Sequence, residues 1–329
     1  MKVLIIGSKE RYEKFLPDLP FMMEIEKVYC NRETPLEELL YLAGDANAIA
    51  VDPTLKLPVN LIESMPNLKI IQSEGVGYNG IDIEVARNHG VYVCNRKGEN
   101  APAVAEQTIL LILALLRNLA KGNELVRKGQ QLKLKETLMV TGIKELRDCT
   151  IGYIGFGDIS KATAQRLKPF GCKQIYHTPN PKEPILEAEY DVTYASLKTL
   201  AQTSDFVVVL CPLNRDTEGM IDEEFFNWMR PYAYLINTAR GEIVDNNALY
   251  NALLNGKIAG AGLDTISPIP VPADHILFTL PPEIQEHLIV SPHIGGVTTR
   301  YFVEAHRKNW ENIYAVMQGH RPTNIVNNL

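Results

Sequence analysis

Short apolar runs alternate with helix-like segments along the whole chain. Within the first hundred residues, strands are predicted at the apolar runs Val3–Ile6, Ala48–Val51, Leu68–Ile71 and Val91–Val93. The stretches between them, such as Pro35–Ala43 and Asp82–Asn88, have helical spacing. Strands that alternate with helices need crossover connections, which give a parallel sheet covered by helices on both faces. The pattern predicts an α/β chain.

A second series of strands and helices follows a strongly apolar segment, Ala101–Leu119. A helix that is apolar on nearly every side must be buried, and its position predicts packing between two domains. Asp222 and Asp245 have the chemistry of helix N-caps, and a last helical pattern runs from Phe302 to Met317. After the polar stretch 121–145, strands are predicted at 149–154, 173–177, 205–210, 234–237, 259–264 and 288–290. Two successive doubly wound units are expected, with the boundary near residue 100.

The segment Gly155–Ser160 lies between a predicted strand and a predicted helix and has the spacing of a dinucleotide-binding loop. Gly155 allows the tight turn, Gly157 lets the backbone approach a pyrophosphate, and the helix N-terminus supplies free N–H groups. Ser160 stands where a third glycine is usual and is small enough for close packing. An ordinary turn of another α/β protein is the alternative. The remaining loop residues are Phe156, Asp158 and Ile159.

The second strand of this unit ends without the carboxylate that usually accepts the ribose hydroxyls of NAD. It runs instead into Thr178, Asn180 and Lys182. Because no negative charge repels a 2′-phosphate there, NADP is favoured over NAD. The alternative is a proline-braced turn with NAD still bound.

Composition excludes several classes of protein. The chain has 329 residues, which at roughly 150 per domain gives about two domains. Its 33 Lys+Arg against 39 Asp+Glu give a net charge of −6, which disfavours nucleic-acid binding. The five cysteines form no CxxC pair, so a reducing, cytoplasmic compartment is expected. The longest apolar run, Ile109–Leu116, is too short to span a membrane, and the scattered histidines predict no metal site.

Several motifs, in their order along the chain, resemble those of the D-isomer-specific 2-hydroxyacid dehydrogenases, the superfamily of glycerate, phosphoglycerate, hydroxypyruvate and formate dehydrogenases. They lie at 76–82, 100–106, 152–157, 211–213, 236–241, 262–264, 291–296 and 322–327. The resemblance implies a flavodoxin-like substrate-binding domain made of residues 1–100 and 294–329. It also implies a Rossmann NAD(P)-binding domain over 101–293, with the active site in the cleft between the two. A homodimer is expected by the same resemblance.

The resemblance also implies roles for individual residues. Arg240 would bind the substrate carboxylate and carbonyl, which suits a permanently charged, forked guanidinium. His293 would be the general acid, because imidazole titrates near neutral pH. Backbone N–H groups of Val76 and Gly77 would hold the carboxylate. The expected cofactor contacts, beyond the phosphate loop, Thr178, Arg240 and His293, are Val104, Cys211, Pro212, Thr238, Ala239, Asp264 and Gly295, of which Thr238, Asp264 and Gly295 would line the nicotinamide.

Two positions depart from the family pattern. Ile269 stands where the family has a glutamate that hydrogen-bonds the catalytic imidazole. His293 should therefore be charged less often at neutral pH, unless Glu283 or Glu286 of a nearby insertion substitutes. Glu74 adjoins the anion-binding loop and would repel an anionic substrate, so it is expected to point outward.

The leading hypothesis is an NAD(P)-dependent oxidoreductase that interconverts a small 2-oxo acid and its D-2-hydroxy acid. One alternative is an oxidoreductase whose substrate needs no acid–base help from His293. Another is a nicotinamide-binding regulator without turnover, which Ile269 favours and which the retained Arg240 and His293 disfavour. The sequence does not identify the substrate, because a methylene in a pocket is worth only about 1–3 kcal/mol of discrimination.

Overall fold

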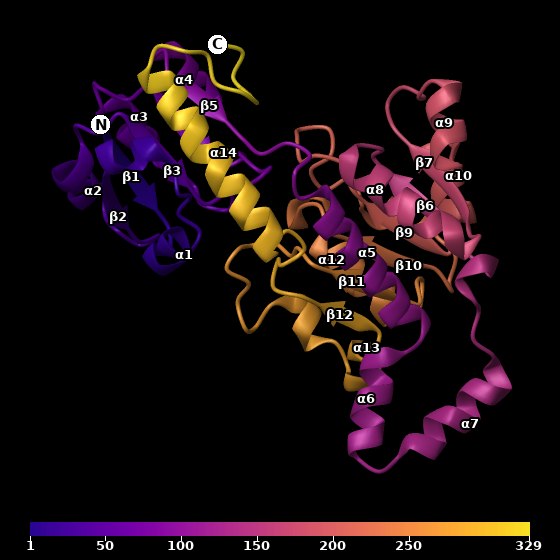
Figure 1. Ribbon diagram of the computed structural model, residues 1–329. Coiled ribbons are helices and arrows are strands. Elements are labelled where there is room, and N and C mark those ends of the chain that lie inside the picture. Colours follow the sequence, from indigo (N-terminus) through magenta and orange to yellow (C-terminus); the bar gives the residue numbers. More distant parts are fainter. The chain divides into compact units, whose positions relative to one another are not determined.

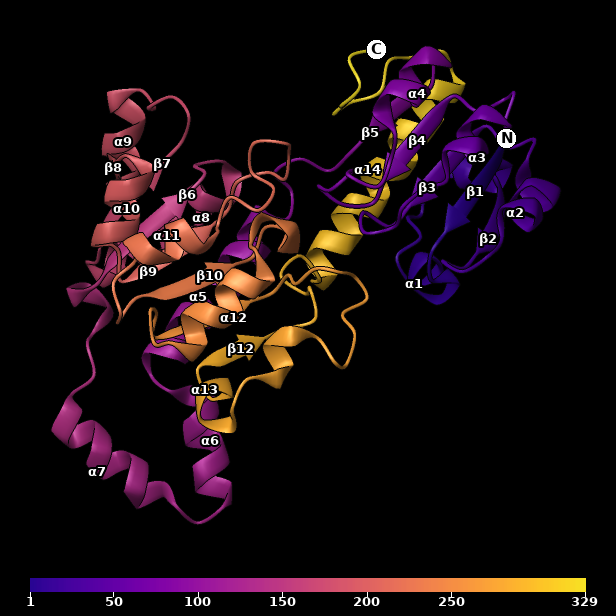
Figure 2. The same cartoon turned by 180° about the vertical axis from the view of Figure 1, so that it is seen from behind.

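A computed structural model describes residues 1–329, which divide into two compact units. Unit 1 comprises Met1–Asn100 and Val297–Leu329, and unit 2 comprises Ala101–Gly296 (Figures 1 and 2). The chain therefore leaves unit 1 after β5, completes unit 2, and returns to unit 1 for its last helix. The second crossing lies three residues after the boundary predicted at 293/294.

Unit 1 is built on a parallel sheet in the order β2-β1-β3-β4-β5. This is the strand order of flavodoxin-like domains, in which the chain reverses its direction of winding beside the first strand. The predicted flavodoxin-like unit is therefore confirmed. The strands are β1 (Lys2–Ile6), β2 (Glu26–Cys30), β3 (Ala48–Val51), β4 (Ile70–Ser73) and β5 (Tyr92–Cys94).

Helices cover both faces of this sheet because successive strand side chains alternate between the faces. Leu4 and Ile6 pack with α2, α3 and α4, whereas Val3 and Ile5 pack with α1 and with Trp310 of α14. Each face therefore has its own apolar core. The helical segments are α1 (Lys9–Lys14), η1 (Pro20–Glu24), α2 (Leu36–Ala43), α3 (Val59–Glu63), α4 (Ile83–Asn88) and α14 (Thr299–Met317).

Unit 2 has a parallel sheet in the order β12-β11-β10-β9-β6-β7-β8. Its first strand, β6, lies between β9 and β7, which is the arrangement of a Rossmann fold. The prediction of a doubly wound dinucleotide-binding sheet is confirmed. The strands are β6 (Thr150–Ile154), β7 (Lys173–His177), β8 (Thr193–Tyr194), β9 (Phe206–Val209), β10 (Tyr234–Asn237), β11 (Gly260–Leu263) and β12 (Leu288–Val290).

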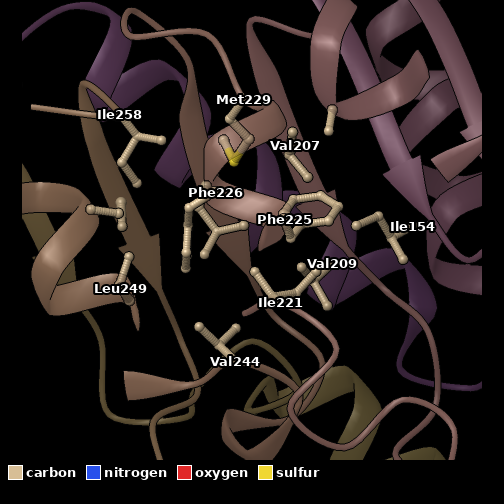
Figure 3. Close-up of a cluster of buried hydrophobic side chains, with 14 of the residues drawn as sticks. Ile154, Val207, Val209, Ile221, Phe225, Phe226, Met229, Val244, Leu249 and Ile258 are labelled. Carbon is tan, nitrogen blue, oxygen red and sulfur yellow. The ribbon is translucent and has the colours of Figure 1, made fainter. Parts of the chain in front are cut away.

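The same alternation builds two cores in unit 2. Val207 and Val209 of β9 face α10, α11 and α12, and Figure 3 shows this cluster around Phe225 and Phe226. Phe206 and Val208 face α5 and α8 on the other side. The helical segments are α5 (Ala101–Leu116), α6 (Leu119–Arg127), α7 (Gln131–Thr141), η2 (Leu146–Asp148), α8 (Asp158–Leu167), η3 (Lys168–Phe170), α9 (Pro184–Tyr190), α10 (Leu197–Thr203), α11 (Glu223–Trp228), η4 (Gly241–Ile243), α12 (Asn246–Leu254), η5 (Ile276–Thr279) and α13 (Pro282–Gln285).

Most predicted elements are present, and the differences fall at edges and in polar segments. Asp222 and Asp245 cap α11 and α12 with their side chains, as predicted. The edge strands β2 and β8 were not predicted, because edge strands are exposed and lack a continuous apolar run. The polar stretch 121–145 contains most of α6 and all of α7, neither of which has a buried residue.

No single helix has the length and apolar character needed to cross a membrane. The pair α5 and α6 passes that test only together, with a 58° bend between them. Buried side chains of α5 pack against α8, β10 and β11 of the same unit.

Candidate active site

The predicted cofactor residues of unit 2 gather at one edge of its sheet. Gly155 follows β6, Thr178 follows β7, Cys211 lies beyond the end of β9, Thr238 follows β10, and Asp264 follows β11. His293 comes shortly after β12. Because all seven strands are parallel, these positions share the carboxyl edge, where open α/β sheets bind ligands.

The phosphate loop has the geometry that its sequence predicts. Gly155 has φ of +92°, and a Cβ there would lie 2.7 Å from the Cys211 backbone nitrogen, so no other residue fits. A Cβ at Gly157 would meet nothing within 4 Å, which leaves open space in front of the backbone. Gly157 is also the N-cap of α8, whose first-turn N–H groups are free to bind an anion. These features fit the pyrophosphate of a dinucleotide.

Other residues of this loop support it rather than contact a ligand with their side chains. Ser160 is buried and donates its hydroxyl to the Gly155 carbonyl at 2.8 Å, which fixes the turn. Phe156 is also buried and packs against Tyr153 and Tyr176. The predicted contribution of Phe156 to cofactor binding is therefore restricted to its backbone.

The end of β7 carries no carboxylate. Thr178 is buried and donates its hydroxyl to the Asn180 carbonyl at 2.6 Å, so that proton is not available to a phosphate. The Lys182 backbone N–H is bound by the Tyr176 hydroxyl at 2.7 Å, and the Lys182 side chain is partly buried. Asn180 is exposed beside it.

Thr238 and Ala239 lie in a turn that is held by hydrogen bonds from neighbouring elements. The Thr238 hydroxyl is 2.8 Å from that of Thr108, which in turn donates to the Val104 carbonyl of α5 at 2.8 Å. Asn237 accepts the Ala239 N–H with its side-chain oxygen. The turn that precedes Arg240 is therefore fixed to both β10 and α5.

Arg240 is held by short contacts on its own turn. Its backbone carbonyl accepts the Asn237 side-chain amide at 2.8 Å, and its Nη1 donates to the Ala239 carbonyl at 2.7 Å. Burial lowers the pKa of the guanidinium, and the nearby Glu242 opposes that shift. The remaining guanidinium N–H groups are available to a carboxylate in a partly desolvated setting, which strengthens such contacts.

Asp264 organises the loop that carries His293. Its Oδ1 accepts the Ser291 hydroxyl at 2.6 Å and the Ile294 N–H at 3.0 Å, and its Oδ2 accepts the Gly295 N–H at 2.8 Å. His293 adopts a left-handed conformation, with φ of +56°. A non-glycine residue in that conformation costs about 1–3 kcal/mol and persists only where surrounding contacts fix it. The Asp264 carboxylate supplies those contacts.

Gln107 belongs to the same network and was not predicted. Its side-chain amide donates to the Ser291 hydroxyl at 2.9 Å, so the helix α5 also supports the His293 loop. Its position directly after the motif at 100–106 is the only signal for it in the sequence.

Of the two departures from the family pattern, the one at position 269 lies in unit 2. Ile269 lies on the loop after β11 with 43% of its surface exposed. Glu286, one of the suggested substitutes, pairs with Lys121 at 2.6 Å and precedes β12, whereas His293 follows β12. The length of a strand therefore separates Glu286 from the imidazole. Cys211, an expected cofactor contact, is buried, and burial raises the pKa of its thiol to about 11. Pro212 beside it accepts the Thr217 hydroxyl.

In unit 1, the carbonyl groups of the loop after β4 all accept hydrogen bonds from the same unit. The Val76 and Gly77 N–H groups have no backbone partner in their unit. This arrangement fits the predicted binding of an anion by those two amides. The carbonyls of residues 74 to 77 accept, in order, the Tyr301 hydroxyl, the Arg96 N–H, the Asn95 side-chain amide and the Ser73 hydroxyl.

The expectation that Glu74 points outward is wrong. Its side chain is only 4% exposed, because Arg11 of α1 and His306 of α14 enclose the carboxylate. The Arg11 guanidinium offsets the charge that would make such burial costly.

Comparisons with known proteins agree with this arrangement. The family model of the D-isomer specific 2-hydroxyacid dehydrogenase NAD binding domain matches residues 109–295. A glyoxylate reductase of Thermofilum pendens is 37% identical over 88% of this chain and 84% of the relative. A glyoxylate reductase of Thermococcus litoralis is 35% identical over 99% of this chain and 97% of the relative. The crystal structure of an NADPH-dependent glyoxylate/hydroxypyruvate reductase of Sinorhizobium meliloti, in complex with NADP and malonate, has a TM-score of 0.82 at 29% identity, over 99% of this chain and 96% of that one.

The fold, the phosphate loop and the similarity to known proteins together define an NAD(P)-dependent 2-hydroxyacid dehydrogenase. The chain belongs to the D-isomer specific 2-hydroxyacid dehydrogenase family. The expectation of an oxidoreductase with a nicotinamide cofactor is confirmed, and the hypothesis of a regulator without turnover is set aside.

Proposed function

We propose that this dehydrogenase reduces glyoxylate, or a 2-oxo acid of similar size such as hydroxypyruvate, to the corresponding D-2-hydroxy acid. The observation that carries the proposal is the Asp264 network, which holds His293 in a strained conformation beside the nicotinamide edge of the sheet. The relatives from Thermofilum pendens and Thermococcus litoralis are both named glyoxylate reductases, which supports the choice of substrate.

Different residues of unit 2 bind the cofactor and deliver the proton. Gly155, Gly157 and the first turn of α8 hold the pyrophosphate, and Thr238, Asp264 and Gly295 line the nicotinamide. The cofactor supplies the hydride. His293 delivers the proton to the carbonyl oxygen as general acid.

Arg240 binds the substrate carboxylate and polarises the carbonyl. A partly buried guanidinium is suited to this role because its fork matches a carboxylate and its charge is permanent. The Val76 and Gly77 amides bind the same carboxylate. The hydrogen bonds that the carbonyl groups of their loop accept support that assignment, because they hold the loop in place. Residues 1–100 with 297–329 are thereby the substrate-binding domain.

NADPH is the proposed cofactor. The absence of a carboxylate after β7 supports it, with Lys182 and Asn180 as the groups that meet the 2′-phosphate. The bound Thr178 hydroxyl proton removes that residue from the set of phosphate donors.

At position 269, Ile269 replaces the glutamate of the family, and Glu286 is engaged by Lys121.

A homodimer formed through α6 and α7 is the proposed assembly. These two helices project from the rest of unit 2 (Figures 1 and 2) and bury no residue. They enclose an apolar groove. An exposed apolar patch of this kind marks an interaction site, because contact with a partner removes the patch from water. The partner we propose is the same α6–α7 segment (the α6–α7 arm) of a second copy, because a two-fold interface pairs the same patch with itself. The groove is lined by Gly122, Leu125, Val126, Gln131, Leu134, Lys135, Leu138, Met139 and Ile143.

The proposed compartment is the cytoplasm. All five cysteines are free and buried, which fits a reducing environment.

Steady-state reduction of glyoxylate, hydroxypyruvate and pyruvate with NADPH tests the function. Turnover of glyoxylate or hydroxypyruvate is expected, and Arg240→Ala should reduce kcat/KM by about tenfold or more, since a charged bidentate contact is lost. No turnover of any of the three acids would refute the proposed substrate. A change below about threefold in Arg240→Ala would refute the role of that residue.

A further inference from the structure

Glu74 places a buried carboxylate directly before the anion-binding loop Gly75–Gly77. The groups that face it are Arg11 and Tyr12 from α1 and His306 from α14, whereas Tyr301 of α14 donates to the Glu74 backbone carbonyl. Arg11 contacts Oε2, and the His306 Nε2 lies 3.3 Å from Oε1. Arg11 supplies the permanent positive charge in this set.

The position of Arg11 depends on the strand ends around it. A Cβ at Gly7, just after β1, would lie 3.2 Å from the Arg11 Nη2, so the glycine makes room for the guanidinium. The Arg11 Nη1 also contacts Asp52, just after β3, at 3.4 Å. The guanidinium thus lies across the ends of β1, β3 and β4, at the switch point of the sheet.

Charges alternate in this network and cancel. Glu74 and Asp52 share Arg11, and Asp52 also contacts Arg32 at 3.1 Å. Two carboxylates therefore face two guanidinium groups. Without Arg11, the buried Glu74 would be left beside the loop with no permanent counter-charge.

An unbalanced carboxylate would oppose the function of the loop. Its charge would lie within three residues of the Val76 and Gly77 amides, in a region of low dielectric where like charges repel over several ångströms. If the Arg11–Glu74 ion pair only tied α1 to β4, removal of either charge would affect the loop in the same direction.

We propose that Arg11 is a positioning residue that neutralises Glu74 and so allows the Gly75–Gly77 loop to accept the substrate carboxylate. The inference rests on the proposed function of that loop. It predicts that substrate affinity follows the net charge of the Arg11–Glu74 pair.

The test measures KM for glyoxylate and for NADPH in four variants of the full chain. Arg11→Met leaves one uncompensated negative charge, and KM for glyoxylate should rise by about tenfold or more. Glu74→Gln leaves an uncompensated positive charge, and KM for glyoxylate should fall below that of the parent. The double variant, R11M with E74Q, should return KM to within about threefold of the parent, and Arg11→Lys, which keeps the charge, should do the same.

The matched control is Arg87→Met, which removes the same charge from α4 and should leave KM for glyoxylate unchanged. KM for NADPH should be constant throughout. If Arg11→Met does not fold, E74Q and the double variant still decide, because neither leaves a buried charge of the wrong sign for the anion. A rise of KM for glyoxylate in E74Q, or no recovery in the double variant, would overturn the proposal. Turnover by the parent separates this failure from failure of the proposed function.

Discussion

The Asp264 carboxylate accepts the backbone N–H of Gly295 at 2.8 Å. Its other oxygen takes the Ile294 N–H and the Ser291 hydroxyl. One side chain at the end of β11 therefore satisfies three donors of the loop that follows β12. Between the two ends of that loop, His293 is held with φ of +56°.

Asp264→Asn should impair catalysis while preserving the fold. An asparagine offers one acceptor oxygen and one amide donor, so at least one of the three donors loses its partner. The loop would then relax and His293 would be misplaced, and kcat should fall by about tenfold or more. Steady-state kinetics with circular dichroism as a folding check would measure this. Gln107→Leu, which removes only the outer hydrogen bond to Ser291, should have a smaller effect. Equal kcat values for Asp264→Asn and the parent would contradict the role of Asp264.

Lys182→Ala should weaken NADPH binding selectively. Loss of a charged contact to the 2′-phosphate costs about tenfold in affinity, whereas NADH has no phosphate to lose. Fluorescence titration of both reduced cofactors would measure the two dissociation constants, with the parent binding NADPH at least as tightly as NADH. A parent that prefers NADH by about tenfold would show that the turn after β7 serves an unphosphorylated ribose.

Ile269→Glu should shift the pH dependence of reduction. A carboxylate next to the imidazole favours its protonated form, which is the form that donates the proton. The falling limb of the pH–rate profile should therefore move to higher pH, by about one unit. Because Ile269 is 43% exposed, the new carboxylate stays hydrated and should not destabilise the fold. Ile269→Gln is the uncharged control. Identical profiles for parent and Ile269→Glu would place position 269 away from His293.

Charged substitutions on the α6–α7 arm should dissociate the dimer. Val126 and Met139 are 55% and 74% exposed and line the apolar groove, so Val126→Glu with Met139→Glu would bury unpaired charges at the interface. Sedimentation at micromolar concentration should give a dimer for the parent and a monomer for the variant. Ile185→Glu, at an 82% exposed site on α9, is the control and should remain dimeric. A monomeric parent would contradict the proposed assembly.

The sequence by itself determined the fold class, the cofactor class and the family. Buried parallel strands are largely apolar runs that are bounded by turns, so β3, β7 and β10 were predicted with the bounds that they have. The phosphate loop was equally clear, because Gly155, Gly157 and Ser160 have the required spacing between an apolar run and a helical pattern. These are local constraints, and each leaves its mark within a few neighbouring residues.

Only the tertiary structure decided which charges and hydrogen bonds meet. Glu74 was predicted to point outward, since its partners Arg11 and His306 are distant in sequence and are brought to it by α1 and α14. The hydrogen bonds from the His293 loop to Asp264, and from Tyr301 to the Glu74 carbonyl, could not be predicted for the same reason. The α6–α7 arm was interpreted as a polar stretch, because its apolar side chains are divided between two helices and neither helix has a continuous apolar face. Periodicity records which side chains are buried, but pairing depends on how the strands and helices are ordered in space.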